Sequence, residues 1–513
     1  MMPPVIIHWF RHDLRLGDNP AFAAAAKLAR EQDAVLLPVF VFDQAPPQRP
    51  IGGASRWWLH HSLNALAAHI QELGGQLLLL QGDTVAQLTR LAQLTNAQAI
   101  THNHVYDQGG RLTVQQLAAA LATSGNTQLH GFDGNVLYPP NSIHPKTPAK
   151  DGAQGFQVFT PFWRAVLAAG DFPAPIPQPP APRWAPLPLS SDLLNDWRLL
   201  PTNPDWAKGF AAAFPRGQGE VAAKQQLQHF LNTALANYDQ RRDIMGENGT
   251  SRLSPYLSWG EISPRQIAEA LVQHAAQHPQ QQKAVDKFLA ELGWREFSCQ
   301  LLVNHPHLPQ RPLRPSFDRF PWQPDAALLQ AWQRGLTGYP IVDAGMRELW
   351  TTGWQHNRVR MITASFLIKH LLQPWQAGEA WFWDTLVDAD AASNAASWQW
   401  VAGCGADAAP YFRIFNPILQ GQKFDADGHY IRRWLPELAR LPNRYIHQPW
   451  NATPLELAAA GVKLGGTGQL AAGCNYPMPI IDHDTARQRA LTAFQQMQSP
   501  QPTLAPPSPD ALG

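Results

Sequence analysis

The chain has 513 residues, of which 45% are hydrophobic, and a formal net charge of +1 at pH 7. Such a chain can bury the cores of two or three domains, which excludes disorder for most of it, and its near-zero charge gives no overall signal for nucleic acid. Its three scattered cysteines are too few for a disulfide framework, a four-cysteine zinc site or an iron-sulfur cluster, so no metal is expected.

The chain begins with a short apolar segment that charged residues soon interrupt. Its first residues, MMPPVIIHWFRHDLRL, lack a signal-peptide cleavage pattern. No apolar run reaches the roughly 18 to 20 residues that span a bilayer. We therefore expect a cytoplasmic monomer without a membrane partner.

The first third of the chain alternates apolar runs with amphipathic stretches. Continuously apolar runs predict buried parallel strands at residues 5–10, 34–43, 76–83 and 97–105. Helical periodicity is present at residues 55–75, 84–94 and 111–122. The alternation predicts a doubly wound α/β domain over residues 3–135. The first strand is followed by RHDLRLGDNPAF and not by GxGxxG, which disfavours a dinucleotide on that turn.

A proline-rich segment, including PAPIPQPPAPRWAPLPL, follows this domain without sustained periodicity. We interpret residues 136–204 as a long connector that packs over the surface. Helical patterns then dominate, and no comparable strand runs appear. A mainly α-helical domain is therefore expected over residues 205–498, with a disordered tail over residues 499–513.

Several polar side chains recur at helical spacing in the second half. Asp390, Asn394 and Trp398 are four residues apart, which predicts one face of a continuous helix, with Asp388 in the preceding turn. Arg360 is a natural partner for a buried Asp388 or Asp390, although such a pair could be purely structural.

Two further segments could carry chemistry. Glu291 and Trp294 share a helical face, although Glu291 could simply pair with Arg295 at i+4. Residues 249–266, GTSRLSPYLSWGEISPRQ, could bind an anion at a helix start, although a capping box would look similar. No GxSxG, HExxH or Walker A motif is present, which argues against a simple hydrolase.

Together these segments resemble the cryptochrome and photolyase family. In family order the chain contains HWFRHDLRLGDNPA, GTSRLSPYLSWGEISPRQ, ELGWREF, TGYPIVDAGMREL, GWQHNRVRMITASFLIK, WQW and DAAPYFRIFNPILQGQKFD. The match covers nearly the whole chain. The resemblance implies an antenna-binding α/β domain and a helical domain that holds FAD in a folded, U-shaped conformation.

The resemblance also implies which residues bind FAD. A diphosphate and ribityl clamp is implied at Tyr238, Thr250, Ser251, Arg252, Leu253 and Ser254. Contacts to the flavin or adenine are implied at Asn357, Arg360, Asp388 and Asp390, with Arg360 and Asp388 as an ion pair. Asn394 has the position that faces the flavin N5. Plant-type cryptochromes have an aspartate there, so this neutral amide favours repair over signalling.

For a DNA lesion, the resemblance implies a pocket with Trp294 and Trp400 as aromatic walls, on which a flipped pyrimidine dimer stacks. Glu291 would hydrogen-bond the pyrimidine edge, and Asn357 and Met361 would complete the floor. Enzymes that repair the (6-4) photoproduct tend to have a histidine where Asn357 stands, so the cyclobutane dimer is the expected substrate. Phosphate contacts at the rim are expected from Arg242, Arg358 and Arg413.

The implied reaction is electron transfer driven by light. Excited reduced flavin would give an electron to the dimer, the ring would open as a radical anion, and the electron would return. Trp398, Trp375 and Trp322 match the family's tryptophan chain, which runs from flavin to surface and reduces the flavin photochemically. For any single tryptophan, core packing is the simpler interpretation.

The subclass and the antenna stay open. Residues 393–412 lack the Asn-Gly-Gly that precedes WQW in many class I enzymes, and they resemble class III photolyases more closely. Gly110 falls near the place of a common folate-binding glutamate, which argues against a folate bound in the usual way. Class III enzymes resemble folate binders with a different pocket, so methenyltetrahydrofolate and a deazaflavin both stay open as the second chromophore.

Repair of cyclobutane pyrimidine dimers in DNA is the expected function. The alternative is a blue-light photoreceptor cryptochrome, which should carry a long C-terminal extension where this chain has a short proline-rich tail. A flavin oxidoreductase is a weaker alternative, because no nicotinamide-binding glycine turn supports it.

Overall fold

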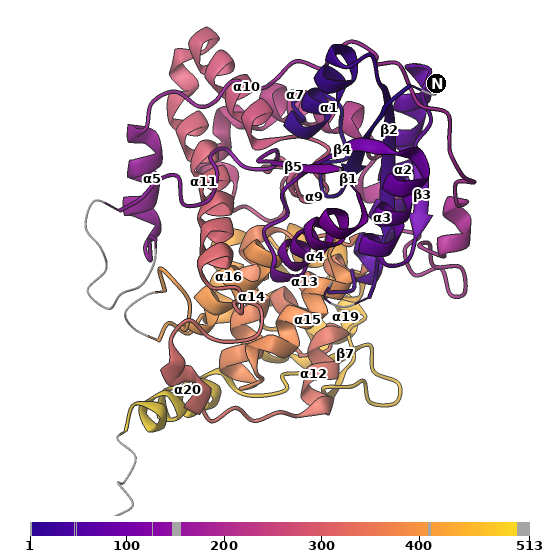
Figure 1. The fold of residues 1–513 in the computed structure, drawn as a ribbon. Helices are drawn as coiled ribbons and strands as arrows, with labels where there is room; N and C mark the ends of the chain where they lie inside the picture. Colours follow the sequence, from indigo (N-terminus) through magenta and orange to yellow (C-terminus); the bar gives the residue numbers. More distant parts are fainter. Residues whose placement is uncertain are drawn as a thin grey trace, which may run out of the picture.

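A parallel sheet and a larger set of helices make up the computed structural model (Figure 1). It describes residues 3–45, 47, 49–125, 127–145, 155–408 and 412–499, so the predicted tail lies outside the described residues from residue 500 onward. None of the helices in the described part of the chain has the length and apolar character that crossing a membrane requires.

The sheet lies in the N-terminal part and has five strands. They are β1 (Val5–Phe10), β2 (Val35–Phe42), β3 (Leu78–Gln81), β4 (Ala97–Asn103) and β5 (Gln128–Phe132). Their order is β3-β2-β1-β4-β5, and every neighbouring pair is parallel. The connecting helices are α1 (Pro20–Glu31), α2 (Gly53–Glu72), α3 (Thr84–Thr95) and α4 (Gln108–Ser124).

Helices cover both faces of this sheet because alternate side chains of each strand point to opposite sides. Ile6 and Phe10 of β1 pack with α1 and α2 in one core, whereas Ile7 and Trp9 pack with α3 and α4 in another. The predicted α/β fold is confirmed. Two elements were not predicted, namely α1, which is rich in alanine, and β5, an edge strand with no fully buried residue.

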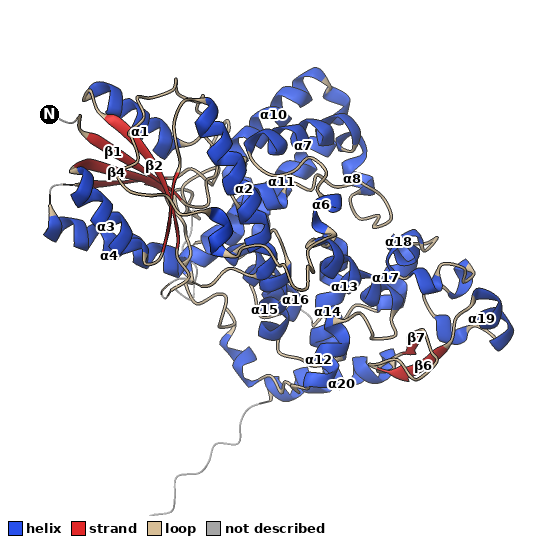
Figure 2. Ribbon diagram, turned by 90° about the vertical axis from the view of Figure 1, so that its right-hand side faces the viewer, coloured by secondary structure: helices blue, strands red, loops and turns tan. Residues whose placement is uncertain are grey.

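The C-terminal part is mainly helical, as predicted (Figure 2). Its helices are α6 (Phe210–Ala213), α7 (Glu220–Thr233), α8 (Tyr238–Arg241), α9 (Ser254–Ser258), α10 (Pro264–Gln277), α11 (Gln282–Asn304), α12 (Ala326–Gln333), α13 (Pro340–Thr352), α14 (Asn357–Ser365), α15 (Trp375–Thr385), α16 (Ala391–Ala402), α17 (Pro417–Phe424), α18 (His429–Trp434), α19 (Pro454–Ala460) and α20 (His483–Gln498). Two short strands that were not predicted, β6 (Leu464–Thr467) and β7 (Tyr476–Met478), pair far from the main sheet.

The proline-rich segment contains a helix that the sequence analysis did not identify. This helix, α5 (Phe159–Ala168), packs against α11. Farther along, the backbone of Trp184 pairs with Leu36 of β2, and its ring lies against Gly75, where an added Cβ would come within 2.5 Å. Residues 146–154 of the predicted connector lie outside the described part.

The segment after β1 joins the sheet to the helical part. Arg15 in this segment is completely buried. Its guanidinium donates to the backbone oxygens of Asp18 (2.7 Å), Gly134 (2.6 Å) and Gly260 (2.8 Å) and to Oδ1 of Asn135 (2.9 Å). The segment RHDLRLGDNPAF, which follows the first strand in place of a GxGxxG turn, therefore joins the sheet to the helical part through Arg15.

A buried carboxylate crosses the same interface. Glu261 accepts hydrogen bonds from Oγ of Ser62 (2.6 Å) and Nε1 of Trp58 (3.1 Å), both in α2, and from the backbone N–H of Gly219 (2.6 Å). Burial raises the pKa of Glu261 from 4.5 to about 7, although these three hydrogen bonds oppose the shift. Between pH 4.5 and about pH 7, the carboxyl group of Glu261 therefore keeps a proton in the folded protein that it has released in the unfolded chain.

We expect the contribution of Glu261 to stability to fall as pH rises from 4.5 to about 7, because its folded pKa lies above its unfolded value. Urea unfolding at about pH 5 and about pH 8 measures this. The free energy of unfolding of the wild type should drop more between the two pH values than that of Glu261→Gln. Equal drops in the two proteins would contradict the expectation.

Candidate functional site

The residues assigned to flavin and lesion come together between packed helices of the C-terminal part. Helix α11 packs against α8 and α16, and α14 packs against α13 and α16. Among the candidates for FAD, four are buried, namely Tyr238, Leu253, Asp388 and Asn394. The others are at least partly exposed, namely Thr250, Ser251, Arg252, Ser254, Asn357, Arg360 and Asp390. The candidates for lesion and phosphate are all at least partly exposed, namely Arg242, Glu291, Trp294, Asn357, Arg358, Met361, Trp400 and Arg413.

The predicted ion pair between Arg360 and Asp388 is present. Nη2 of Arg360 lies 2.7 Å from Oδ2 of Asp388, whose side chain is 1% exposed, and Nε of Arg360 donates to the backbone oxygen of Gln355 (2.8 Å). Oδ1 of Asp388 is buried and has no hydrogen-bond partner among the described residues. Buried carboxylate oxygens are rarely left unpaired, so this atom fits an N–H group of the flavin or adenine.

Trp354 connects the predicted diphosphate clamp to the start of α14, a role that the sequence analysis did not assign. Its Nε1 donates to Oγ of Ser254 (3.3 Å). The guanidinium groups of Arg252 and Arg360 lie 4.5 Å and 6.0 Å from its ring centroid. Arg252 has a φ of +51°, which is uncommon for a residue with a side chain and directs the chain into this contact. The guanidinium of Arg252 near the hydroxyl of Ser254 fits a diphosphate, whereas the guanidinium of Arg360 is paired with Asp388.

Helix α16 begins at Ala391, one residue after Asp390, which the prediction had placed within the helix. Asp390 does not lie on the helical face with Asn394 and Trp398, because it is the N-cap of α16 and has an extended backbone. Its side chain accepts a hydrogen bond from the backbone N–H of Ser393 (2.6 Å). Asn394 and Trp398 are both buried in α16, as expected for one face.

Asn394 contacts a pair of residues that the sequence analysis did not identify. Its Nδ2 donates to Oε1 (2.9 Å) and to the backbone oxygen (3.1 Å) of Glu379 in α15. Both carboxylate oxygens of Glu379 in turn accept from Arg49, at 2.8 Å each. Arg49 lies between β2 and α2, 330 residues away in sequence, so no local pattern could have shown this contact.

The two predicted aromatic walls are braced by α5 and by the loop after α16. The ring of Trp294 stacks on Phe159 of α5, with centroids 3.8 Å apart and planes 8° apart. Nε1 of Trp400 donates to the backbone oxygen of Asp407 (3.1 Å), whose N–H donates to the backbone oxygen of Gln157 (3.0 Å). The start of α5 therefore contacts Trp294 directly, and the residue Gln157 before it is linked to Trp400 through Asp407.

Glu291 forms an ion pair with Arg242, and the alternative pairing with Arg295 is wrong. Nη1 of Arg295 donates instead to the backbone oxygen of Asn135 (2.6 Å). Because Arg242 precedes α11 in sequence by two helices, the spacing within α11 could not indicate this partner.

The three predicted phosphate contacts differ in their surroundings. Arg242 is held by Glu291, and Arg358 forms a 2.8 Å ion pair with Asp243. Arg413 is exposed, and its guanidinium lies 5.0 Å from the ring centroid of Phe415. Arg413 is therefore the most accessible of the three.

The predicted electron path comprises Trp398 in α16, Trp375 at the start of α15 and Trp322 before α12. The ring of Trp398 lies against Gly378 of α15, where an added Cβ would come within 2.1 Å. The backbone N–H of Gln323 donates to the oxygen of Leu372 (2.9 Å), which brings the segment of Trp322 beside α15. Trp398 and Trp375 are buried and Trp322 is partly exposed.

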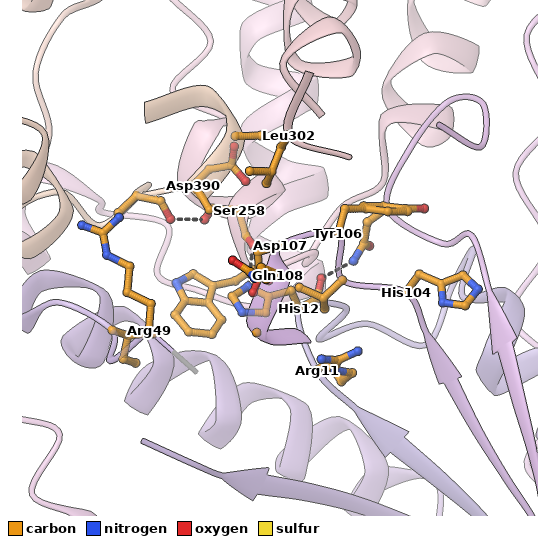
Figure 3. Close-up of a pocket in the computed structure, with 18 of the residues that line it drawn as sticks. Arg11, His12, Arg49, His104, Tyr106, Asp107, Gln108, Ser258, Leu302 and Asp390 are labelled. Carbon is orange, nitrogen blue, oxygen red and sulfur yellow. Dashed lines mark hydrogen bonds between the residues drawn. The ribbon is translucent and has the colours of Figure 1, made fainter. Parts of the chain in front are cut away.

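A cavity of about 480 Å³ lies between the sheet and the helical part (Figure 3). Its lining includes Arg11 and His12 after β1, residues 104–109 after β4, and Ser258 and Asp390 of the helical part. It therefore lies outside the carboxyl ends of parallel strands, where α/β proteins commonly bind ligands.

Gly110 borders this region and lies against the end of the Arg11 side chain. Nη2 of Arg11 donates to the backbone oxygen of Gly110 (3.1 Å) and would lie 2.8 Å from a Cβ at that position. A larger side chain at residue 110 would therefore require the guanidinium of Arg11 to shift.

The sequence matches two family models, "DNA photolyase" over residues 6–182 and "FAD binding domain of DNA photolyase" over residues 288–496. The deoxyribodipyrimidine photo-lyase of Agrobacterium fabrum is 47% identical over 497 residues, covering 96% of this chain and 97% of that relative. Cryptochrome-2 of Arabidopsis thaliana is 35% identical and covers 96% and 79%. The crystal structure of a bacterial class III photolyase from Agrobacterium tumefaciens has a TM-score of 0.88 at 46% identity and covers 97% of this chain and 98% of that chain.

Proposed function

Because the chain belongs to the DNA photolyase family, we infer that it is a deoxyribodipyrimidine photo-lyase, which binds FAD and uses blue light to repair cyclobutane pyrimidine dimers in DNA. The observation that carries this function is the 47% identity to a photo-lyase over nearly the full length of both chains, against 35% to cryptochrome-2. The structural likeness to a class III photolyase supports that branch of the family.

We propose that the chain holds FAD between the loop before α9, α14 and the start of α16. Arg252 and Ser254 donate to the diphosphate, with Tyr238, Thr250, Ser251 and Leu253 around it. Oδ1 of Asp388 accepts an N–H group of the cofactor while Arg360 orients the carboxylate. Asp390 and Asn357 make further contacts, and Asn394 faces the flavin N5. When bound and reduced, FAD supplies the electron that light drives into the dimer.

We propose that the chain binds an extruded dimer between Trp294 and Trp400, above Asn357 and Met361. Glu291, held in place by Arg242, hydrogen-bonds the pyrimidine edge. The stacking of Trp294 on Phe159 fixes the orientation of its ring before DNA arrives. Trp398, Trp375 and Trp322 are proposed to carry electrons between the flavin and the surface.

Trp294→Ala and Trp400→Ala should each weaken binding to dimer-containing DNA by about 5-fold to 150-fold, because stacking is worth about 1–3 kcal/mol per base. Binding to undamaged DNA should change little. Titration of a fluorescent oligonucleotide measures both affinities. Trp350→Ala is the matched control, because Trp350 is an exposed tryptophan in α13 whose ring contacts are with Trp206 and Trp381 and not with residues assigned to the pocket. Unchanged affinity in both pocket variants would reject the proposed walls.

Lesion discrimination tests the proposed substrate. We expect tight binding to an oligonucleotide with one cyclobutane dimer, weaker binding to one with a (6-4) photoproduct, and the weakest binding to undamaged DNA. The affinity for all three should fall with salt as phosphate contacts are screened. Equal affinity for the three DNAs would contradict a site built for the cyclobutane dimer.

A blue-light photoreceptor is the second candidate, because cryptochrome-2 matches 96% of this chain. The neutral amide of Asn394 favours repair, since plant-type cryptochromes have an aspartate at that position. A protein that binds FAD and responds to light but leaves dimers intact would support the photoreceptor.

A second chromophore, methenyltetrahydrofolate or a deazaflavin, is proposed to bind in the cavity of about 480 Å³. His12 and Trp259, whose rings stack with centroids 4.8 Å apart, offer an aromatic surface in its wall. The protein is further proposed to act as a monomer in the cytoplasm.

A further inference from the structure

An arginine from the α/β part reaches the amide that is proposed to face the flavin. We propose that Arg49 is a positioning residue for FAD chemistry, acting through Glu379 to fix which end of the Asn394 amide faces the flavin. This inference rests on the proposed function, because it takes Asn394 as the residue beside the flavin N5.

The hydrogen bonds define the direction of the amide. Glu379 is an acceptor on both its carboxylate and its backbone oxygen, and both accept from Nδ2 of Asn394. The two N–H groups of the amide are therefore used by one residue, which leaves Oδ1 to point away from Glu379. An oxygen presented to the flavin accepts a hydrogen bond, whereas a nitrogen would donate one.

Arg49 binds the carboxylate of Glu379, which orients the amide of Asn394. The guanidinium binds Glu379 through two parallel hydrogen bonds of 2.8 Å, and the carboxylate is 3% exposed. This fork fixes the plane of the carboxylate, which a single point charge would not do. No second cation pairs with Glu379 among the described residues. Without Arg49 the carboxylate would be free to turn, and Asn394 would keep only the backbone oxygen of Glu379 as a fixed acceptor.

The position of Arg49 is itself fixed by contacts with α15. Its guanidinium lies 4.1 Å from the ring centroid of Trp383, and Nε1 of Trp383 donates to the backbone oxygen of Pro50 (2.8 Å). The backbone N–H of Gly53 donates to Oδ1 of Asp384 (2.8 Å). Arg49 also lines the cavity of about 480 Å³ (Figure 3), so one side chain contacts both the proposed antenna cavity and the support of the flavin-facing amide.

Four single variants and one double variant test the inference by the redox behaviour of the bound flavin. Arg49→Ala and Glu379→Gln remove the oriented carboxylate, and Arg49→Lys keeps the charge but loses the fork. Asp384→Asn is the control, because it removes the negative charge from a neighbouring contact between α2 and α15 without touching Glu379. The measurements are the midpoint potential and absorption spectrum of bound FAD, and the rate at which its reduced form oxidises in air.

Arg49→Ala and Glu379→Gln should each change the air-oxidation rate by about tenfold, the order expected for one charge-assisted hydrogen bond. The two variants should shift the midpoint potential of bound FAD in the same direction as each other. Arg49→Lys should give a smaller shift. The double variant Arg49→Ala/Glu379→Gln should differ little from either single variant, since both substitutions act on the contact between Arg49 and Glu379. Asp384→Asn should leave both readouts unchanged.

The inference is overturned if Arg49→Ala has the potential and spectrum of the wild type, or if Asp384→Asn shifts them equally. Should Arg49→Ala fail to retain FAD, Arg49→Lys and Glu379→Gln decide by the same criteria. A wild type that binds no FAD or repairs no dimers would reject the proposed function. A competent wild type with unshifted variants would reject only the role of Arg49.

Discussion

Replacing Asp388 by asparagine should weaken FAD binding on the order of 100-fold. Asparagine has one side-chain oxygen where aspartate has two, so it can no longer accept hydrogen bonds from Arg360 and from the cofactor at once. A hydrogen bond to a charged group contributes about 1.5–3 kcal/mol, and the upper end of that range corresponds to about 100-fold in affinity. Titration of the apoprotein with FAD, followed by flavin fluorescence, measures the affinity.

Glu437→Gln is the matched control for Asp388→Asn. Glu437 forms an ion pair of 2.7 Å with Arg347, whose side chain is 27% exposed, close to the exposure of Arg360. It contacts none of the residues assigned to FAD, so this variant should bind FAD as the wild type does. If Asp388→Asn also kept wild-type affinity, the proposed location of the cofactor would be wrong.

Replacing Arg15 by alanine should destabilise the folded protein by more than about 4 kcal/mol. The variant leaves buried acceptors on Asp18, Gly134, Asn135 and Gly260 without a donor, and each such loss costs about 1–3 kcal/mol. Arg15→Lys should rescue little of this loss, because an ammonium cannot reproduce the planar fork. Urea unfolding followed by tryptophan fluorescence gives the midpoints for comparison.

Arg183→Ala is the control for Arg15→Ala. Arg183 pairs with Asp33 at the surface, with side chains that are 61% and 92% exposed, so its loss should change stability by less than about 1 kcal/mol. An Arg15→Ala protein as stable as Arg183→Ala would show that the segment after β1 does not fasten the two parts.

The fold was predictable where one physical signal dominated. Strands β1 and β2 are buried along their whole length, so their sequences are continuously apolar and their existence was predicted. Strand β5 lies at the sheet edge and carries partly exposed side chains, which removes that signal. Strands β6 and β7 are too short to show periodicity. Helix α5 has a strong apolar content but was hidden within a proline-rich segment.

The candidate site was predictable from motifs but its contacts were not. A cation and an anion in apolar surroundings predicted a pair of Arg360 with Asp388 or Asp390, and the family resemblance implied Asp388, which is the partner in the structure. The pairs of Glu291 with Arg242 and of Glu379 with Arg49 join separate elements, and no spacing rule connects such residues. Likewise, Arg15 lies in a family motif, but its hydrogen bonds between the sheet and the helical part could not be predicted, because the acceptors are far from it in sequence.

The most direct test of the proposed function is repair of a defined lesion. The purified protein is loaded with FAD, reduced without oxygen, mixed with an oligonucleotide that carries one thymine cyclobutane dimer, and exposed to blue light or kept dark. We expect the illuminated sample to recover two intact thymines and the dark sample to keep the dimer. Dimers that survive illumination of a fully loaded, reduced protein would contradict the function.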